Sequence, residues 1–371
     1  MMLQAQSNCI MHHHPDASKR KTVSFPVRKM LAPVAVLLGT MAFHASARAA
    51  DSAVVVAYHR FGEDASPASS IRVDQFEQHL AELKDGGFHV LPLPEIIESI
   101  VKGRLLPEKT VAITIDEARR SVADVAIPLL EKHGFPFTLF VASDPVDRKA
   151  ENAMTWDEIA AVAKKGGTIG VYPSSPEPMA FLPVDEAAAR INRSAARIRE
   201  MTGETPALLA WPAGEVPGAL RQRAATLGYA AAFGLQSGSV AAGADMLILP
   251  RFSMTEKYGD IERFRIAARS LPLPVSDMTP EDMVLGGNPP NIGFTVNGGF
   301  DLSRLSCFVG GSGKAHIEVL GNARVEIRLS EPLEDRRSRL NCTLPSGADE
   351  SGMPRWRWLG AQYVLPQELL P

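Results

Sequence analysis

The sequence predicts an α/β fold followed by a smaller all-β region, and two patterns carry that prediction. Between residues 53 and 270, short apolar runs alternate with stretches whose apolar residues recur three or four positions apart. After residue 274 the helical period is lost, and short runs follow between Gly, Asn and Asp turns. Repeated strand–helix units build a parallel sheet, open or closed into a barrel, whose strand ends face the active site.

The apolar runs of the first region are rich in Val, Ile, Phe and Ala and do not alternate, as in strands buried on both faces. We expect strands over 54–59, 89–91, 111–116, 137–142, 168–172, 207–211 and 230–233. We expect helices over 73–83, 93–101, 122–133, 156–165, 185–201 and 219–227. Six short runs between 292 and 365 suggest a small antiparallel sandwich or barrel.

The first 49 residues have the order of a secretory signal. Basic residues precede an apolar run at 31–43, and the small residues Ala47 and Ala49 follow it. The run is too short to cross ~30 Å of hydrocarbon, although an uncleaved membrane anchor is the alternative. We therefore expect a signal peptide at 1–49, an α/β domain at 50–274 and a β domain at 275–371. The mature protein would be exported, periplasmic or extracellular, with no membrane span.

Charge and cysteine content sharpen this picture. The 371 residues hold 39 Lys and Arg against 42 Asp and Glu, a net charge of -3. Cleavage after Ala49 removes six basic residues and one acidic residue, and leaves a net charge of -8. Because the chain has no excess of basic residues, nucleic acid is excluded as a partner. The sequence does not indicate the oligomeric state. Cys307 and Cys342 remain, and in an exported protein they predict a disulfide, with two buried thiols as the alternative.

One strand ends in two adjacent acids, Asp116 and Glu117. Carboxylates at the mouth of a parallel barrel suit general-base or metal-ligand chemistry. An Asp at a strand end can equally cap the following helix. Both interpretations stay open from these residues alone.

Several motifs in order then indicate a family. They are AYHRFGED at 57–64, ITIDEA at 113–118, MTWDEI at 154–159, TIG at 168–170, WPAGE at 211–215 and LPRF at 249–252. From about residue 54 to 254 the chain resembles the polysaccharide deacetylase family, also called carbohydrate esterase family four or the NodB-homology fold. The resemblance implies a distorted (β/α) barrel that removes acetyl groups from N-acetylated glycans. It also implies a divalent metal, usually zinc, held by one Asp and two His, with a second Asp as general base and a backbone N–H at the oxyanion. The last strands look like a β domain appended in some secreted members.

This sequence departs from the family pattern at the metal. Asp116 stands at the general-base position and Ala213 at the backbone oxyanion position, but Glu117 replaces the metal-binding Asp. Tyr172 and Pro176 stand in the two histidine positions. Proline has no side-chain ligand and a neutral phenol is a poor one, so we expect that zinc is not bound here.

Other residues offer partial substitutes. His59 is the one histidine of the mature chain that ends a strand at the predicted mouth, and Glu177 is a conceivable extra ligand. Arg251 offers a charge partner for Asp116 or Glu117 that compensates for a missing cation. We expect Tyr172 and Trp211 to line a glycan groove, with His59 and Arg251 as further contacts.

Three functions follow as alternatives. The first is an exported, inactive member of the family that binds a glycan. The second is an active deacetylase whose altered site uses Asp116, Glu117 and His59. The third is an interaction module in which Trp356 and Trp358, two apart on one strand, bind a glycan or a protein partner; core packing of these rings is the competing explanation.

Overall fold

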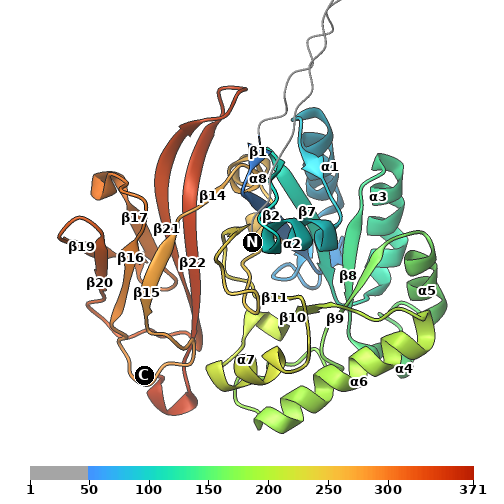
Figure 1. The fold of residues 1–371 in the computed structure, drawn as a ribbon. Coiled ribbons are helices and arrows are strands. Elements are labelled where there is room, and N and C mark those ends of the chain that lie inside the picture. Colours follow the sequence, from blue (N-terminus) through green and yellow to red (C-terminus); the bar gives the residue numbers. More distant parts are fainter. Residues whose placement is uncertain (1–48) are drawn as a thin grey trace, which may run out of the picture. The chain divides into compact units, whose positions relative to one another are not determined.

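The computed structural model describes residues 49–371, which belong to one compact unit (Figure 1). The predicted signal peptide lies outside the described residues, except for Ala49. In the described part of the chain, no helix has both the length and the apolar composition needed to cross a bilayer.

A curled sheet of nine strands forms the centre of the α/β part (Figure 1). The strands are β2 (Ser52–Tyr58), β5 (His89–Val90), β7 (Thr110–Asp116), β8 (Phe137–Val141), β9 (Thr168–Val171), β10 (Leu208–Ala210), β11 (Ala231–Phe233), β12 (Ser239–Ala241) and β13 (Phe252–Ser253). Their order is β11-β10-β9-β8-β7-β2-β12, with β5 beside β7 and β13 beside β2. Every ladder is parallel except that between β12 and β2. All seven expected strands are present, and the α/β class is confirmed.

Eight α-helices connect or flank these strands in the described chain. They are α1 (Val73–Asp85), α2 (Leu93–Val101), α3 (Ile127–His133), α4 (Ser143–Asp147), α5 (Trp156–Lys164), α6 (Val184–Thr202), α7 (Gly218–Ala225) and α8 (Ile261–Ala268). Helix α5 begins at a capping box, in which Thr155 and Glu158 satisfy each other's backbone N–H groups. The expected helix at 122–133 is a π-helical turn, Val122–Ala126, that continues into α3.

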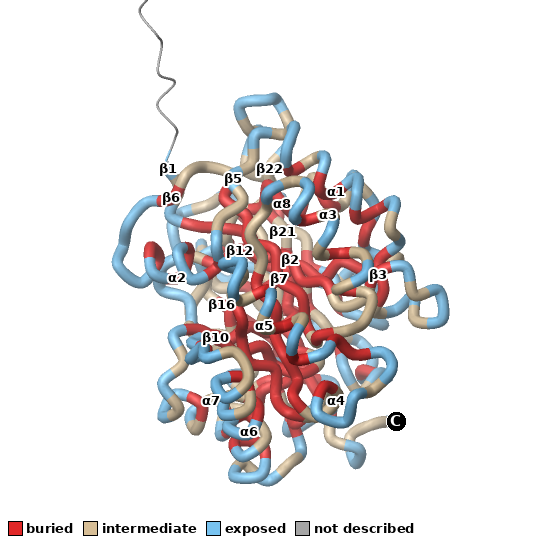
Figure 2. Tube along the Cα trace, turned by 90° about the vertical axis from the view of Figure 1, so that its right-hand side faces the viewer, coloured by how far each residue is buried: buried red, intermediate tan, exposed pale blue. Residues whose placement is uncertain are grey.

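Alternate residues of each strand belong to different apolar layers. Val54 and Val56 of β2 pack in the cluster shared with α1 and α3, whereas Val55 packs with Phe140 and helix α2 on the inner side of the curl. This follows from the period of two along a strand. Buried segments accordingly fill the centre of Figure 2. The inner side is therefore packed with side chains rather than open.

One segment links the two ends of the curled sheet. Leu249 forms a parallel bridge with Phe233 of β11, and three residues later Phe252 pairs with Val56 of β2. Arg251 lies between these two contacts, and its side chain is fully buried. The closure of the curl therefore decides where Arg251 is placed.

The C-terminal part contains two mainly antiparallel sheets (Figure 1). The first contains β14 (Leu271–Pro272), β17 (Ser306–Val309), β18 (Gly313–Lys314), β21 (Arg337–Ala348) and β22 (Pro354–Val364). The second contains β15 (Val275–Thr279), β16 (Ile292–Val296), β19 (His316–Leu320) and β20 (Arg324–Arg328). Short pairs join β1 (Ala49–Ala50) to β6 (Leu106–Pro107) and β3 (Arg60–Phe61) to β4 (Ser70–Ile71). Cys307 and Cys342 pair across β17 and β21 and form a disulfide.

Strand β22 contributes one of the contacts between the two parts. The ring of Trp358 meets that of Phe252 edge-on, with centroids 5.1 Å apart. Trp358 therefore packs against the α/β part rather than inside the core between the two C-terminal sheets. The expectation that its ring fills the core of a sandwich is wrong for this residue. The predicted domain division at residue 274 stays a prediction, although the change from parallel to antiparallel sheets falls close to it.

Candidate functional site

Asp116 ends strand β7 inside the curl, and its side chain is fully buried. Both of its carboxylate oxygens accept hydrogen bonds from Arg251. Arg251 Nη1 lies 2.6 Å from Oδ1, and Nη2 lies 2.7 Å from Oδ2. A bidentate, charge-assisted pair of this kind is the geometry in which a buried carboxylate is best compensated.

Arg251 is held from several other directions as well. Its Nε donates to the carbonyl oxygen of Gly234 at 3.0 Å, and Nη1 also donates to Thr114 Oγ1 at 3.1 Å. The guanidinium carbon lies 5.5 Å from the ring centroid of Phe140 and 5.8 Å from that of Phe233. Of the two carboxylates that the sequence offers to Arg251, the structure places Asp116 against it. Buried as it is, Arg251 does not present the glycan contact that we expected.

His59 follows β2 and lies at the same end of the sheet. Its Nε2 is 3.5 Å from Asp116 Oδ2, and its side chain is 14% exposed. His79, by contrast, is a structural residue: it hydrogen-bonds Tyr58 and the carbonyl of Gly259, each at 2.9 Å. Burial lowers the pKa of His79 to about 4. His59 is therefore the histidine that contacts the site.

Glu117, the neighbour of Asp116, has an ion-pair partner of its own. Its backbone has φ of 64°, in the left-handed region that a Glu adopts at a cost. Its carboxylate forms an ion pair with Arg119. The two adjacent acids of the sequence therefore have separate cationic partners.

Tyr172 follows β9, points into the inner layer and is 2% exposed. Burial raises the pKa of the Tyr172 phenol well above its usual value, and the carboxylates of Asp116 and Glu117 raise it further. The nearby guanidinium of Arg251 and a hydrogen bond with the backbone of Ala213 lower that pKa. The phenol therefore lies close to Ala213, the residue that the sequence assigns to the oxyanion position.

Trp211 does not line a groove. Its side chain is fully buried in the layer between sheet and helices, and its indole N–H donates to the carbonyl of Leu247 at 2.8 Å. The expectation of a glycan groove walled by Trp211 and Tyr172 is therefore wrong. The reason is the period of two: Ala210 faces the inner layer, so the next residue faces outward.

The loop after β9 supplies no metal ligand beside Asp116. Pro176 is half-buried and has no donor atom in its side chain. Glu177, the conceivable extra ligand, has a side chain 72% exposed, with Oε2 3.3 Å from Nη1 of Arg190. Of the two positions that carry histidine in the family pattern, 172 holds a buried tyrosine and 176 holds a proline without a donor atom.

The donor set does not fit the zinc ion that the resemblance implies. Zinc needs three or four converging Cys, His, Asp or Glu donors. Among residues 49–371 there is no group of three such side chains that could hold a metal ion. Both oxygens of Asp116 are hydrogen-bonded to Arg251 instead. The side chains around Asp116 therefore do not form a zinc site of the family kind.

The C-terminal part reaches the Ala213 loop, which the sequence did not predict. Gln362 Nε2 donates to the carbonyl of Ala213 at 3.0 Å. The fully buried carboxylate of Glu215 accepts two bonds from Arg336, at 2.7 and 2.9 Å, and one from Arg337 at 2.9 Å. The sequence signal for this contact was Glu215 itself, an acid in the WPAGE motif that has no basic residue as a close neighbour in the sequence.

Comparison with known proteins agrees with this fold. A family model described as polysaccharide deacetylase matches residues 104–232. The match assigns a polysaccharide deacetylase domain to this part of the chain. This confirms the resemblance drawn from the motifs.

The relatives and solved structures compared here cover between 50% and 59% of this chain. The chain is 22% identical over 228 residues to the poly-beta-1,6-N-acetyl-D-glucosamine N-deacetylase of Escherichia coli K12, covering 50% of this chain and 34% of that one. The chain thus spans about a third of the length of that relative. The deacetylase PplD of Streptococcus pyogenes superposes with a TM-score of 0.55 at 19% identity, over 58% of this chain and 98% of PplD. IcaB from Ammonifex degensii gives a TM-score of 0.54 at 25% identity, over 59% and 98%.

Proposed function

We propose that this protein is an exported, catalytically inactive polysaccharide deacetylase-family member that binds an N-acetylated glycan. The observation that carries this proposal is the buried, bidentate pair of Asp116 and Arg251. The glycan as ligand is carried over from the named substrate of the Escherichia coli relative.

The pair and its burial make Asp116 a poor general base. Each carboxylate oxygen keeps one lone pair beside its bond to Arg251, but a general base must also reach the water that it activates. Both oxygens of Asp116 accept from the guanidinium of Arg251, and the carboxylate is shielded from solvent.

Export is supported by two features. The first 49 residues have the basic, apolar and small-residue order of a signal peptide. The disulfide between Cys307 and Cys342 suits an oxidising compartment such as the periplasm or the extracellular space.

The test is the metal content and acetate release of the exported protein. We expect no stoichiometric zinc and no acetate from β-1,4- or β-1,6-linked N-acetylglucosamine oligomers, with an active deacetylase assayed in parallel. Stoichiometric zinc together with acetate release that Asp116→Asn abolishes would overturn the proposal.

That outcome would instead support an active enzyme with an altered site. The one observation in favour of this second candidate is His59, which is partly exposed and 3.5 Å from Asp116. His59→Ala would then reduce acetate release, whereas it leaves an inactive protein unchanged.

A further inference from the structure

Three cationic side chains lie around Tyr258, in the segment between β13 and α8. The guanidinium carbon of Arg263, on α8, is 5.0 Å from the centroid of the Tyr258 ring, and Nζ of Lys257 is 5.4 Å from it. Arg339, on β21 of the C-terminal part, is also within electrostatic reach of the Tyr258 phenol. We call Lys257, Tyr258, Arg263 and Arg339 the Tyr258 cluster.

No carboxylate of the described chain forms an ion pair with the cations of this cluster. Arg263 Nη1 donates to the carbonyl oxygen of Tyr258 at 2.6 Å, and Arg339 Nε donates to Gln362 Oε1 at 3.2 Å. Both acceptors are neutral. Elsewhere at the junction of the two parts, Arg269 instead meets the carboxylate of Asp349 at 2.9 Å.

The acids that neighbour the cluster in the sequence have other roles. Asp260 accepts from the backbone N–H groups of residues 262 and 263 and so caps α8. Glu262 pairs with Arg265, and the charge of Glu256 acts on the pKa of Arg72. The positive charge of the cluster is therefore not balanced from within its own segment.

Burial makes this unbalanced charge costly. Arg263 and Arg339 are both half-buried. Burial and the charge of Arg339 lower the pKa of Arg263 to about 10, and burial and the charge of Arg337 lower that of Arg339. Two partly desolvated guanidiniums that repel each other are stabilised when an anion lies between them.

The free donors of the two guanidiniums favour a phosphate group. Nε and Nη2 of Arg263, and both Nη atoms of Arg339, bond no acceptor of the described chain. A carboxylate pairs with one such fork, whereas a phosphate monoester has three oxygens that can accept from two guanidiniums at once. It also carries about two negative charges, which match two arginines better than one charge does.

We propose that the Tyr258 cluster binds a phosphate group, with Arg263 and Arg339 both donating to its oxygens. Lys257 and the hydroxyl of Tyr258, whose side chain is 39% exposed, complete the site on the solvent side. This ligand class does not depend on the proposed function, because it follows from the charges of the cluster alone.

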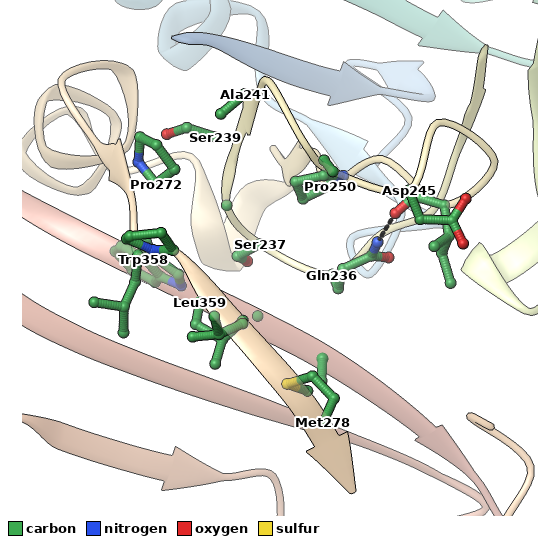
Figure 3. Close-up of a pocket in the computed structure, with 18 of the residues that line it drawn as sticks. Gln236, Ser237, Ser239, Ala241, Asp245, Pro250, Pro272, Met278, Trp358 and Leu359 are labelled. Carbon is green, nitrogen blue, oxygen red and sulfur yellow. Dashed lines mark hydrogen bonds between the residues drawn. The ribbon is translucent and has the colours of Figure 1, made fainter. Parts of the chain in front are cut away.

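The phosphate would lie near the loop of Ala213. Gln362 accepts from Arg339 through Oε1, and its Nε2 donates to the carbonyl oxygen of Ala213 at 3.0 Å. The cavity of about 760 Å³ that Trp358 and Leu359 border in Figure 3 is a separate feature, because no residue of the Tyr258 cluster lines it.

The test is calorimetric titration of the full exported protein with inorganic phosphate, glycerol 3-phosphate and acetate, in a phosphate-free buffer of low ionic strength. Arg263→Gln and Arg339→Gln each remove one guanidinium of the cluster. Arg328, on β20 of the other C-terminal sheet, has a side chain 55% exposed and provides the matched control Arg328→Gln.

We expect the wild type to bind inorganic phosphate or glycerol 3-phosphate, and either cluster variant to weaken that binding at least about tenfold. The control should bind as the wild type does, and acetate should bind at least about tenfold more weakly than phosphate. Added phosphate should also raise the melting temperature of the wild type and leave that of the cluster variants unchanged. Two variants keep the test informative if one of them does not fold.

Absence of binding to both phosphate compounds, or equal affinity in the wild type and the folded cluster variants, would overturn the proposal. Equal affinity for acetate and phosphate would refute the assignment to phosphate. Binding of glycerol 3-phosphate alone would support the site and identify a phosphorylated organic molecule as its ligand. Equal binding of both compounds would support it and show that the phosphate group itself is recognised.

Discussion

At the scale of single residues, Arg251 accounts for much of how this site differs from the family pattern. Its guanidinium supplies the positive charge opposite Asp116, and four further groups hold it in place: Gly234, Thr114 and the rings of Phe140 and Phe233. A carboxylate in the interior requires such a partner, because its desolvation is costly. An internal cation thus makes the buried acid tolerable without any bound ion.

Replacing Arg251 with Ala should therefore destabilise the protein strongly. We expect a loss of about 3–5 kcal/mol in the free energy of unfolding, since the change leaves a buried carboxylate unpaired. Denaturant unfolding monitored by circular dichroism measures it.

The control is Arg104→Ala, which removes an arginine from a half-exposed pair with Glu98 and should cost at most about 1 kcal/mol. An unfolding midpoint for Arg251→Ala equal to that of the wild type would contradict the compensation argument.

At the scale of elements, strand β22 joins the two parts through a close backbone approach. Gly360 lies opposite Asn341 of β21, and a Cβ atom at Gly360 would lie 2.1 Å from the carbonyl oxygen of Ser237. That atom belongs to the backbone of the α/β part and cannot rotate away. The absence of a side chain at this position allows the contact.

Gly360→Ala should push the loop at 236–238 and β22 apart. We expect a loss of about 1–3 kcal/mol, the usual cost of inserting a methyl group into a packed interface. Thermal unfolding compared with Gly286→Ala tests this, because a Cβ at Gly286 meets nothing within 4 Å. Equal melting temperatures for the two variants would show that the interface yields without cost.

At the scale of the whole molecule, the C-terminal part is attached to the α/β part by polar pairs as well as by packing. Glu215 bonds Arg336 and Arg337, and Arg269 pairs with Asp349 at 2.9 Å. Hydrogen bonds from this network help lower the pKa of Asp349 despite its desolvation. The disulfide within the C-terminal part adds a covalent restraint to the sheet that carries these contacts.

Loss of that disulfide should weaken the C-terminal part. The bond joins residues separated by 35 positions, and in the chain-entropy model it contributes about 4 kcal/mol. We expect a lower unfolding midpoint for the Cys307→Ser, Cys342→Ser double variant. The double variant should also lose the sensitivity to dithiothreitol that the wild type shows, and a wild type insensitive to the reductant would count against this contribution.

Much of the fold could be predicted from the sequence, and less of the site. The buried strands and most helices were predictable because their periodicities are local. Strands β12 and β13 were missed because pairing with β2, rather than an apolar run of their own, defines them. Trp211 was assigned to the wrong layer, since its direction depends on which neighbour faces the curl.

The sequence by itself determined the class of fold, the family and the absence of histidines at positions 172 and 176, because each is a matter of residue type and local spacing. The tertiary structure decided which charge Asp116 meets. Arg251 is 135 residues away in the chain and reaches the carboxylate only because the segment around it closes the curled sheet. Such a pairing depends on sheet register and closure, which no local pattern encodes.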